Sequence, residues 1–268
     1  SLYPERIIVG CSNSKKINKN FKKYLKSYNS PILAMKYESA ELTKMSINAF
    51  LSSSITTTNT LSEICEKIDA DWSEIKPALT TDKRIGKYAY TDPGLGISGG
   101  NLERDLNGLI KIGKKNKTDF KVIKTWISNS TYRKKWIWDK LNELILKKTK
   151  KPKISILGLA YKENTNSIKN APSIFLLKKL KGYNVQAYDP CIKKRDIKYK
   201  INFTNNSIQT LKNSDVLLIL TPWKEFKFLT PKVLIKNMKK KIVIDPFRVL
   251  NGNLLMRSGF IYASLGKK

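Results

Sequence analysis

The sequence predicts an α/β protein in which a helical central domain is followed by a doubly wound, Rossmann-like domain with a parallel sheet. Apolar residues recur at helical spacing from Tyr37 to about Ala70, which predicts a long helix. In the second half, helical segments alternate with four short apolar runs, at residues 154–157, 185–188, 216–220 and 242–244. Short apolar strands separated by helices are typical of a parallel sheet covered on both faces. Ligands of such a sheet bind beyond the carboxyl ends of its strands.

The first residues predict a short strand followed by a helix. Arg6 to Gly10 form an apolar, β-branched run, and a lysine-rich helical segment covers about Lys15 to Tyr28. Because a domain rarely opens on a lone buried strand, we expect residues 1–35 to be the end of a domain whose earlier part precedes this chain.

Two features of the sequence bear on where the predicted helices that follow break, start and end. The Ser-Thr run at 52–58 is expected to break or weaken the long helix, because β-branched and hydroxyl-bearing residues have low helix preference. A shorter helix is predicted to start at Trp72, with Asp71 as its N-cap and with Pro77 limiting its length.

Further helices are predicted from Leu102 to Lys115 and from Asp119 to Lys148. The lysine-rich run at 146–153 contains Pro152 and predicts a solvated linker. After it, a helix from Ser173 to Lys181 separates the first two predicted strands. The expected domains are therefore 1–35, 36–150 and 151–268.

Composition excludes several classes of protein. The 268 residues are 41% hydrophobic, which is too apolar for a disordered chain. No apolar run approaches the ~20 residues that span a bilayer, and the first residues lack the layout of a signal peptide, so a cytoplasmic protein without a membrane partner is expected. Three scattered cysteines and no histidine argue against a disulfide framework, a metal site and a histidine general base.

The formal net charge of +31 raises the alternative of nucleic-acid binding. The lysines, however, are spread along the whole chain, which is typical of a solvated surface rather than of one basic face. We therefore expect no nucleic-acid partner and assign the charge a milder role, the attraction of anionic nucleotide substrates.

A glycine-rich loop, GLGISGG at 94–100, runs into an amphipathic helix. Glycines allow the backbone to approach a ligand closely, although a surface turn would explain such a cluster equally well. Asn101 is predicted to be the N-cap of the helix, and Glu103 and Asp105 place acid in its first turn. A second candidate lies after the first predicted strand, where Tyr161 and Lys162 offer a ring and an ammonium for a base or sugar and a phosphate.

Residues 93–105, PGLGISGGNLERD, resemble the active-site loop P-G-x-G-[YF]-G-G-S-C-F-P-K-D of the UDP-glucose/GDP-mannose dehydrogenase family. The run from Gly158 to Pro172 resembles the family signature G-L-A-F-K-x-x-T-D-D-I-R-E-x-P, with Asn166 and Ser167 in place of two acids and Lys169 in place of arginine. Further matches extend the resemblance over nearly the whole chain, at 4–10, 41–50, 82–86, 188–190, 221–226 and 245–252.

The resemblance implies a nucleotide-sugar dehydrogenase that oxidises the sugar CH–OH with NAD and forms a homodimer through the central helix. In that family a cysteine captures the intermediate aldehyde, and its position is occupied here by Asn101, whose amide cannot form the adduct. By resemblance, Lys44 and Asn48 hold a water and stabilise the oxyanion, and Asp105 assists water activation. The implied substrate contacts are Arg84 (toward a neighbouring subunit), Asp92, Leu95, Gly96, Ile97, Ser98, Tyr161, Lys162 and Arg248, and Lys169 is the implied contact to NAD.

Taken without the resemblance, Lys44 and Asn48 would be a surface pair at i and i+4, and Arg248 a surface arginine. Two readings of the function stay open beside nucleic-acid binding. One is a partial dehydrogenase whose NAD domain mostly precedes this chain and whose chemistry stops after one oxidation or hydrates the aldehyde directly. The other is a catalytically inactive homologue that binds a nucleotide sugar or a partner subunit.

Overall fold

The computed structural model describes residues 3–13 and 17–268, and these fall into two compact units divided between Phe50 and Leu51. The first unit contains β1 (Ile7–Gly10), α1 (Lys19–Lys26), β2 (Ile32–Met35) and the start of α2 (Tyr37–Ile68). β1 pairs in parallel with β2, from Ile7 opposite Ile32 to Gly10 opposite Met35. The predicted first strand is therefore present, and Lys15, where the predicted helix begins, lies outside the described residues.

Helix α2 runs without a break through the Ser-Thr run, so the expected interruption was wrong. Thr56 and Thr60 each donate their hydroxyl to a carbonyl one turn earlier, on Ser52 and Thr56, at 2.9 Å. The hydroxyls are thereby satisfied on the helix itself. Several of these small polar residues are also buried. Packing of this face outweighs the low intrinsic helix preference.

Helix α3 (Trp72–Thr81) confirms one expectation and corrects another. Asp71 caps it, accepting a hydrogen bond of 2.9 Å from the N–H of Ser73. Pro77, however, lies inside the helix and does not end it. The carbonyl that Pro77 leaves without an N–H partner belongs to Ser73, an exposed residue, so water can take the place of the missing bond.

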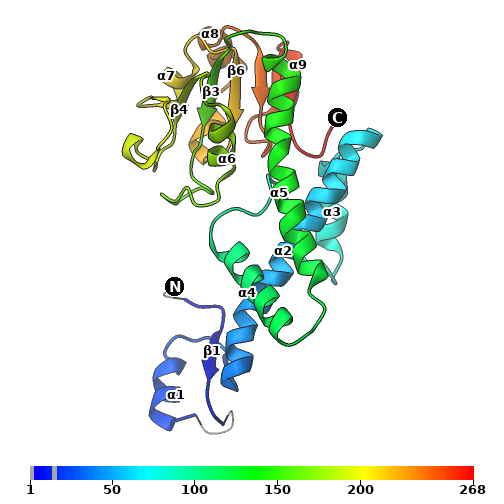
Figure 1. Ribbon diagram of the computed structural model, residues 1–268, viewed down its shortest axis with the longest axis vertical. Helices are drawn as coiled ribbons and strands as arrows, with labels where there is room; N and C mark the ends of the chain where they lie inside the picture. Colours follow the sequence, from blue (N-terminus) through cyan, green and yellow to red (C-terminus); the bar gives the residue numbers. More distant parts are fainter. Residues whose placement is uncertain (1–2, 14–16) are drawn as a thin grey trace. The chain divides into compact units, whose positions relative to one another are not determined.

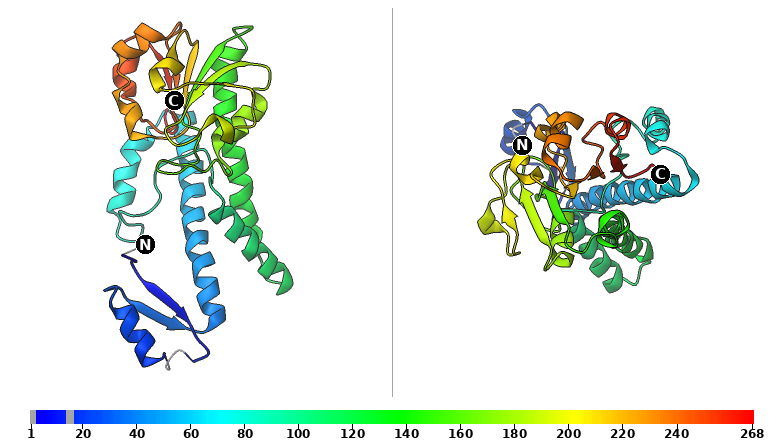
Figure 2. Two further views of the ribbon diagram at one scale, coloured as in Figure 1. Left: turned by 90° about the vertical axis from the view of Figure 1, so that its left-hand side faces the viewer. Right: turned by 90° about the horizontal axis from the view of Figure 1, so that it is seen from above.

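Helices α4 (Asn101–Lys115) and α5 (Lys121–Leu141) follow, and α5 ends in a π-helical turn, Asn142–Leu146. The end of this helix packs into the same hydrophobic core as the sheet, through Trp136, Ile137, Leu141 and Ile145. Figures 1 and 2 both show α5 rising beside the strands. Pro152 is buried, so the run at 146–153 leads directly into the first strand of the sheet and is not a fully solvated linker.

The sheet of the second unit has six parallel strands in the order β5-β4-β3-β6-β7-β8, which confirms the predicted fold class. Its strands are β3 (Lys153–Leu157), β4 (Asn184–Tyr188), β5 (Asn202–Phe203), β6 (Val216–Ile219), β7 (Ile242–Ile244) and β8 (Ile261–Ala263). The helices between them are α6 (Pro172–Lys179), α7 (Ser207–Leu211), α8 (Pro231–Asn237) and α9 (Gly252–Arg257). The two edge strands, β5 and β8, were not predicted from the sequence.

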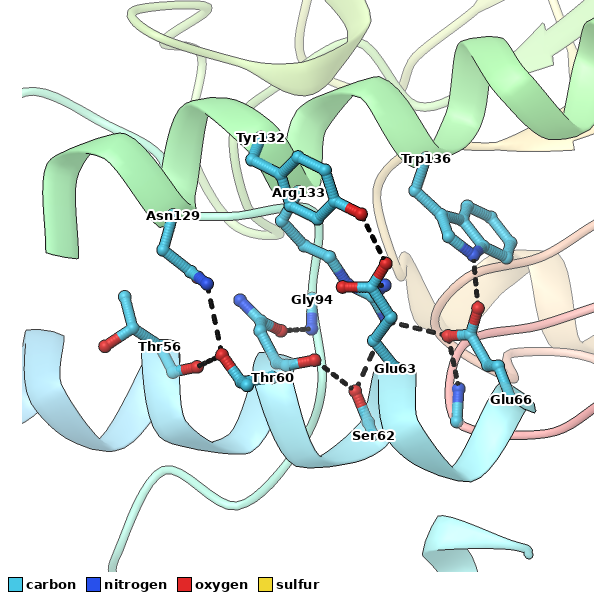
Figure 3. Close-up of polar contacts among 12 residues, drawn as sticks. Thr56, Thr60, Ser62, Glu63, Glu66, Gly94, Asn129, Tyr132, Arg133 and Trp136 are labelled. Carbon is cyan, nitrogen blue, oxygen red and sulfur yellow. Dashed lines mark hydrogen bonds and ion pairs between the residues drawn. The ribbon is translucent and has the colours of Figure 1, made fainter. Parts of the chain in front are cut away.

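Polar contacts join α2 to α5 within the second unit (Figure 3). The guanidinium of Arg133 is buried, and its Nη2 lies 2.7 Å from Oε1 of Glu66 and 3.3 Å from Oγ of Ser62. Oε2 of Glu66 accepts a hydrogen bond of 2.8 Å from the indole of Trp136. Tyr132 donates its hydroxyl to Glu63 at 2.7 Å. The two helices are thus joined by an ion pair and by hydrogen bonds.

Among the residues that the structure describes, none of the helices combines the length and the apolar character that crossing a bilayer requires.

Candidate functional site at the carboxyl edge of the sheet

The sheet has its topological switch point between β3 and β6, because the chain passes from β3 to β4 on one side and reaches β6 on the other. Gly158, directly after β3, has φ +90°, and a Cβ added there would lie 2.5 Å from the backbone N of Thr221, the second residue after β6. Thr221 in turn donates its hydroxyl to the carbonyl of Ala160 at 2.6 Å. The two loops are therefore held close together where a parallel sheet binds its ligands.

Asp189, which follows β4, organises this edge. Its buried Oδ2 accepts hydrogen bonds from the N–H groups of Leu159 at 2.7 Å and Ala160 at 3.0 Å, and from the indole of Trp223 at 3.1 Å. One carboxylate thus joins the loops after β3, β4 and β6. The sequence contained the signal in its Tyr-Asp-Pro match, but the pattern did not reveal which groups the carboxylate binds.

The glycine loop lies against this edge and is anchored by helices on its other side. The N–H of Gly94 donates to Oδ1 of Asn59 on α2 at 2.8 Å, and the N–H of Ile97 donates to Oγ of Ser130 on α5 at 2.7 Å. The indole of Trp72 donates to the carbonyl of Thr91 at 2.8 Å. The backbone of the segment is therefore fixed at several points before α4 begins.

Glycine is required in this loop because the loop touches the segment after β3. Gly99 has φ +78°, and a Cβ there would lie 2.8 Å from the ring of Tyr161. A Cβ on Gly100 would lie 2.6 Å from Cδ of Lys169. The structure thus brings together the two motifs that carried the family resemblance, which are about sixty residues apart in the chain.

Asn101 does not cap α4, contrary to the sequence prediction. The helix begins at Asn101 itself, the N-cap is Gly100, and no side-chain hydrogen bond caps it. The helix therefore begins one residue earlier than the pattern implied. Asn101 is exposed at the start of the helix, with Glu103 as the acid of the first turn.

Other predicted substrate residues of the loop differ in accessibility. The side chains of Leu95 and Ile97 are only 1% and 2% exposed, so a ligand could reach only their backbone. Gly96, with φ +80°, packs on the carbonyl of Ser130, and Ser98 is half-buried. Asp105 is buried on α4, and its Oδ1 accepts a hydrogen bond of 3.0 Å from Nε of Arg104.

A partly buried chain of polar groups that the sequence did not reveal lies beneath the loop. Lys134 on α5 donates its ammonium to Oδ1 of Asn170, whose Nδ2 donates to the carbonyl of Ile97 at 3.2 Å and to Oε2 of Glu103 at 2.5 Å. Burial lowers the pKa of Lys134, and the carboxylate of Glu103 opposes that shift. These residues connect α5, the loop after β3 and the glycine loop.

Asp92 and Arg248 line one cavity of about 630 Å³ that extends from the glycine loop over the ends of β6 and β7. Its walls are largely apolar, with Trp72, Pro93, Pro222, Pro246 and Phe247. Asp92 pairs with Lys76. Arg248, with φ +53°, directs its Nη1 to Oδ1 of Asp71 at 2.9 Å and its Nη2 to the carbonyl of Leu265 at 3.0 Å. The guanidinium is therefore engaged within the protein at the rim of this cavity.

Asp71, the partner of Arg248, also pairs with Lys267. Burial raises its pKa, but hydrogen bonds from Ser73, Lys267 and Arg248 outweigh burial and hold the pKa well below its usual range. Asp71 thus remains ionised at neutral pH and connects α3 to the turn after β7.

The remaining predicted residues are more exposed. Lys162 extends over the ring of Tyr161, 5.7 Å from its centroid, and is exposed to solvent beside the glycine loop. Arg84 pairs with Asp82 at 2.7 Å, a contact that raises the pKa of the guanidinium. Lys44 and Asn48 lie one turn apart on α2 in the first unit, with Lys44 exposed and Asn48 half-buried.

Two domain models of one family match the chain. The central domain of the UDP-glucose/GDP-mannose dehydrogenase family matches residues 38–131, and the UDP binding domain of the same family matches residues 155–252.

Similar curated proteins include the UDP-glucose 6-dehydrogenase of Rickettsia bellii, 31% identical over 275 residues that cover 100% of this chain and 63% of the relative. The UDP-glucose 6-dehydrogenase TuaD of Bacillus subtilis is 30% identical and is matched over 98% of this chain and 58% of its own length. The chain therefore spans about three fifths of the length of these relatives.

Solved structures share the fold. A UDP-D-ManNAc dehydrogenase from Pyrococcus horikoshii superimposes with a TM-score of 0.83 at 23% identity, over 99% of this chain and 60% of that one. A UDP-glucose dehydrogenase from Pyrobaculum islandicum gives a TM-score of 0.82 at 23% identity, over 98% of this chain and 59% of that one.

Proposed function

Because the chain belongs to the UDP-glucose/GDP-mannose dehydrogenase family, we propose that it provides the nucleotide-sugar site of an oxidoreductase that oxidises the sugar CH–OH with NAD. The observation that carries this proposal is the contact of the glycine loop with Tyr161 and Lys169 at the switch point of the sheet. A nucleotide sugar has an apolar base, an anionic diphosphate and a polyhydroxyl sugar. The site offers partners for each of these parts.

The exposed ammonium of Lys162 supplies a cation for the diphosphate, and the adjacent ring of Tyr161 supplies a flat surface for the base or sugar. The apolar cavity beside Pro93 gives a place for the remaining ring, with Asp92 and Arg248 at its wall. By the family motif, the segment Leu95 to Ser98 is assigned to the sugar. Within it the N–H and C=O of Ile97 are bonded to Ser130 and Asn170, which leaves the backbone of Gly96 and Ser98 for the ligand. The net charge of +31 attracts the anionic substrate from solution.

The reacting groups are assigned by the family motifs. Lys44 and Asn48 hold a water and stabilise the oxyanion that forms during oxidation, and Asp105 assists water activation. Asn101 occupies the position of the cysteine nucleophile, and its delocalised amide nitrogen cannot add to an aldehyde. Oxidation without that covalent step ends at the aldehyde, or continues only if water adds to it directly.

Residues of this chain do not by themselves fit an NAD site. Gly94, Gly96 and Gly99 have the G-x-G-x-x-G spacing, but residues 82–100 contain only turns and bends, so no strand feeds that loop. The segments after β1 and β3 follow strands and lack the spacing. Lys169, which packs against Gly100, is the one residue assigned to NAD. We therefore derive no hydride-transfer step from this chain.

A homodimer through the central helix is part of the proposal. Leu61, Ile64 and Ile68 follow one another at helical spacing on α2 and are 41%, 47% and 67% exposed. Such a stripe on a long helix is suited to packing against a second copy of the same helix. By the family motif, Arg84 would reach the substrate of the neighbouring subunit.

Calorimetric titration of the chain with UDP-glucose, GDP-mannose and UDP tests the nucleotide-sugar site. We expect saturable binding of at least one nucleotide sugar, weakened about tenfold or more by Lys162→Met because the diphosphate loses a cation. Lys135→Met, which removes an exposed lysine of α5, is the matched control and should leave the affinity unchanged. Salt-sensitive DNA binding without nucleotide-sugar affinity would contradict the proposal.

Asn101 favours a second candidate function, a catalytically inactive homologue that binds a nucleotide sugar. The two are distinguished in a protein that also carries the NAD domain, by measuring NADH formation and products. NADH with aldehyde product supports the dehydrogenase, and carboxylate that forms only in Asn101→Cys identifies the missing step. Binding without NADH formation supports the inactive homologue.

A further inference from the structure

Lys134 is an unusual lysine because its ammonium is buried and its hydrogen-bond partner is a neutral amide. The residue is 8% exposed on α5, and Nζ donates to Oδ1 of Asn170. Burial of an ammonium is costly unless something is gained by it, and the pKa of Lys134 is lowered accordingly.

What the lysine provides is the orientation of Asn170. A lysine can only donate, so the Asn170 oxygen must face Lys134, and the Nδ2 group must then face the other way. There it donates to the carbonyl of Ile97 at 3.2 Å and to Oε2 of Glu103 at 2.5 Å. Asn170 itself has φ +54°, a conformation that asparagine tolerates better than most residues. Both the residue type and its orientation therefore suit this position.

The other polar group of Ile97 is also bound. Its N–H donates to Oγ of Ser130 at 2.7 Å, and Ser130 lies one turn before Lys134 on the same face of α5. Ile97 is thus held through N–H and C=O in the middle of a segment with glycines at 94, 96, 99 and 100. Without these bonds, the glycines would let the loop sample many conformations.

We propose that Lys134 and Asn170 are positioning residues for the nucleotide-sugar site, which hold the glycine loop through Ile97 and Glu103 in the shape that receives the ligand. The inference rests on the proposed function, since it takes the loop to be the binding surface. A loop fixed before binding loses less conformational freedom when the ligand arrives, so the network should raise affinity without touching the ligand.

Hydrogen–deuterium exchange of the loop amides tests, without ligand, whether Lys134 and Asn170 hold the glycine loop. Calorimetry with UDP-glucose tests whether this raises the affinity. Lys134→Met removes the ammonium and keeps the buried stem. Asn170→Gly removes the amide and tolerates the positive φ, and it provides a second variant if the first does not fold. Asn170→Asp can still accept from Lys134 but cannot donate to Ile97, and it would repel Glu103. Lys135→Met is the matched control, as an exposed lysine next to Lys134.

We expect the three site variants to exchange the amides of residues 94–100 about tenfold faster or more, while β3 and β6 amides exchange as before. Their dissociation constants for UDP-glucose should rise about tenfold, with the control unchanged. Loop exchange equal to wild type, or faster exchange with unchanged affinity, would overturn the positioning role alone. Failure of wild type to bind UDP-glucose, UDP or GDP-mannose would overturn the proposed function and this inference together.

Discussion

Arg133 and Lys134 are neighbours on α5, and both are buried, but they meet different partners. Arg133 is 1% exposed and lies 2.7 Å from a carboxylate oxygen of Glu66. Lys134 is 8% exposed and donates to the neutral amide of Asn170. Successive side chains on a helix point about 100° apart, so one residue serves the contact with α2 and the other the glycine loop. The buried cation at the contact with α2 is therefore paired directly with a carboxylate, whereas the buried cation beneath the glycine loop is hydrogen-bonded to a neutral amide.

A similar contrast holds between two acids, the partly buried Asp71 and the fully buried Asp245. Asp71, beside the helices, accepts hydrogen bonds from Ser73 and is paired with Lys267 and Arg248. Burial raises its pKa, but these contacts together hold the pKa well below the usual range. Asp245, at the end of β7, accepts hydrogen bonds from neutral donors, among them the N–H of Leu250 at 2.8 Å and the hydroxyl of Tyr262 at 3.0 Å. Burial raises the pKa of Asp245 to about 6. Burial therefore disfavours the ionised form of Asp245, at the carboxyl edge of the sheet where the ligand is proposed to bind.

The largest expected effect is the loss of a paired charge in the helix contact. Arg133→Met leaves the carboxylates of Glu63 and Glu66 near one another without their buried cation. We expect the free energy of unfolding to fall by about 3–5 kcal/mol. Urea unfolding measures it, with the exposed Lys135→Met as control, which should change it by less than about 0.5 kcal/mol. A loss below about 1 kcal/mol would mean that the pair does not stabilise the helix contact.

Asp245→Asn tests the opposite arrangement through pH. Because the folded pKa of about 6 exceeds the ordinary 3.8, the folded state holds a proton that the unfolded chain releases between about pH 4 and 6. The contribution of Asp245 to stability is therefore greatest below pH 4 and falls by about 2–3 kcal/mol as the pH rises through this interval. Asparagine keeps an oxygen acceptor for Leu250 and Tyr262 and cannot ionise.

Urea unfolding from pH 4 to 7 should show that the free energy of unfolding of Asp245→Asn increases relative to that of wild type as the pH rises. The exposed Asp139→Asn is the matched control for removal of one negative charge. Parallel pH profiles for wild type and Asp245→Asn would contradict a raised pKa at the sheet edge.

Asp71→Asn should cost less than loss of Arg133, because the carboxylate is 15% exposed. The change weakens the N-cap of α3 and removes the ion pairs to Arg248 and Lys267, so we expect a loss of about 1–2 kcal/mol at pH 7. Since the folded pKa is lowered, the contribution is present above about pH 4 and is lost as the pH falls through the folded value. The difference between variant and wild type in urea should therefore shrink in acid. A difference independent of pH would assign the effect to packing.

How far the sequence predicts this molecule depends on whether the signal is local. The four central strands were predicted because each is a compact apolar run with buried residues on both faces. β5 and β8 were missed because they are short, lie at the edges and carry half-exposed residues such as Asn202 and Ile261. Asn101 was wrongly predicted to be an N-cap because the glycine before it already takes that position and no side chain caps the helix, although Asn is a preferred N-cap residue.

The same limit applies to the site. Tyr161, Lys162 and the glycine loop stand in contiguous motifs, so the sequence alone could propose them as site residues. Ser130 and Lys134 stand in an ordinary polar stretch of helix, and Lys134 reaches a partner 36 residues away. Their role follows only from the packing of α5 under the loop.

Lys134→Met is expected to change stability least, and this sharpens the contrast with Arg133. Removal of the ammonium leaves Oδ1 of Asn170 without its donor and removes the attraction to the carboxylate of Glu103, but it also removes a charge whose burial is costly. These effects oppose one another, so the free energy of unfolding should change by less than about 1 kcal/mol at pH 7. Because burial lowers the pKa from its ordinary 10.5, the folded state releases this proton at lower pH than the unfolded chain. The free energy of unfolding of wild type should therefore rise as the pH rises toward 10, because the cost of burying the ammonium disappears. The variant lacks this group, so its stability should fall relative to wild type over that range. Urea unfolding at pH 7, 8.5 and 10 measures this, with Lys135→Met as the comparison. If the free energy of unfolding fell as much as in Arg133→Met, Lys134 would contribute to stability as strongly as its neighbour, and the distinction between the two faces of α5 would be wrong.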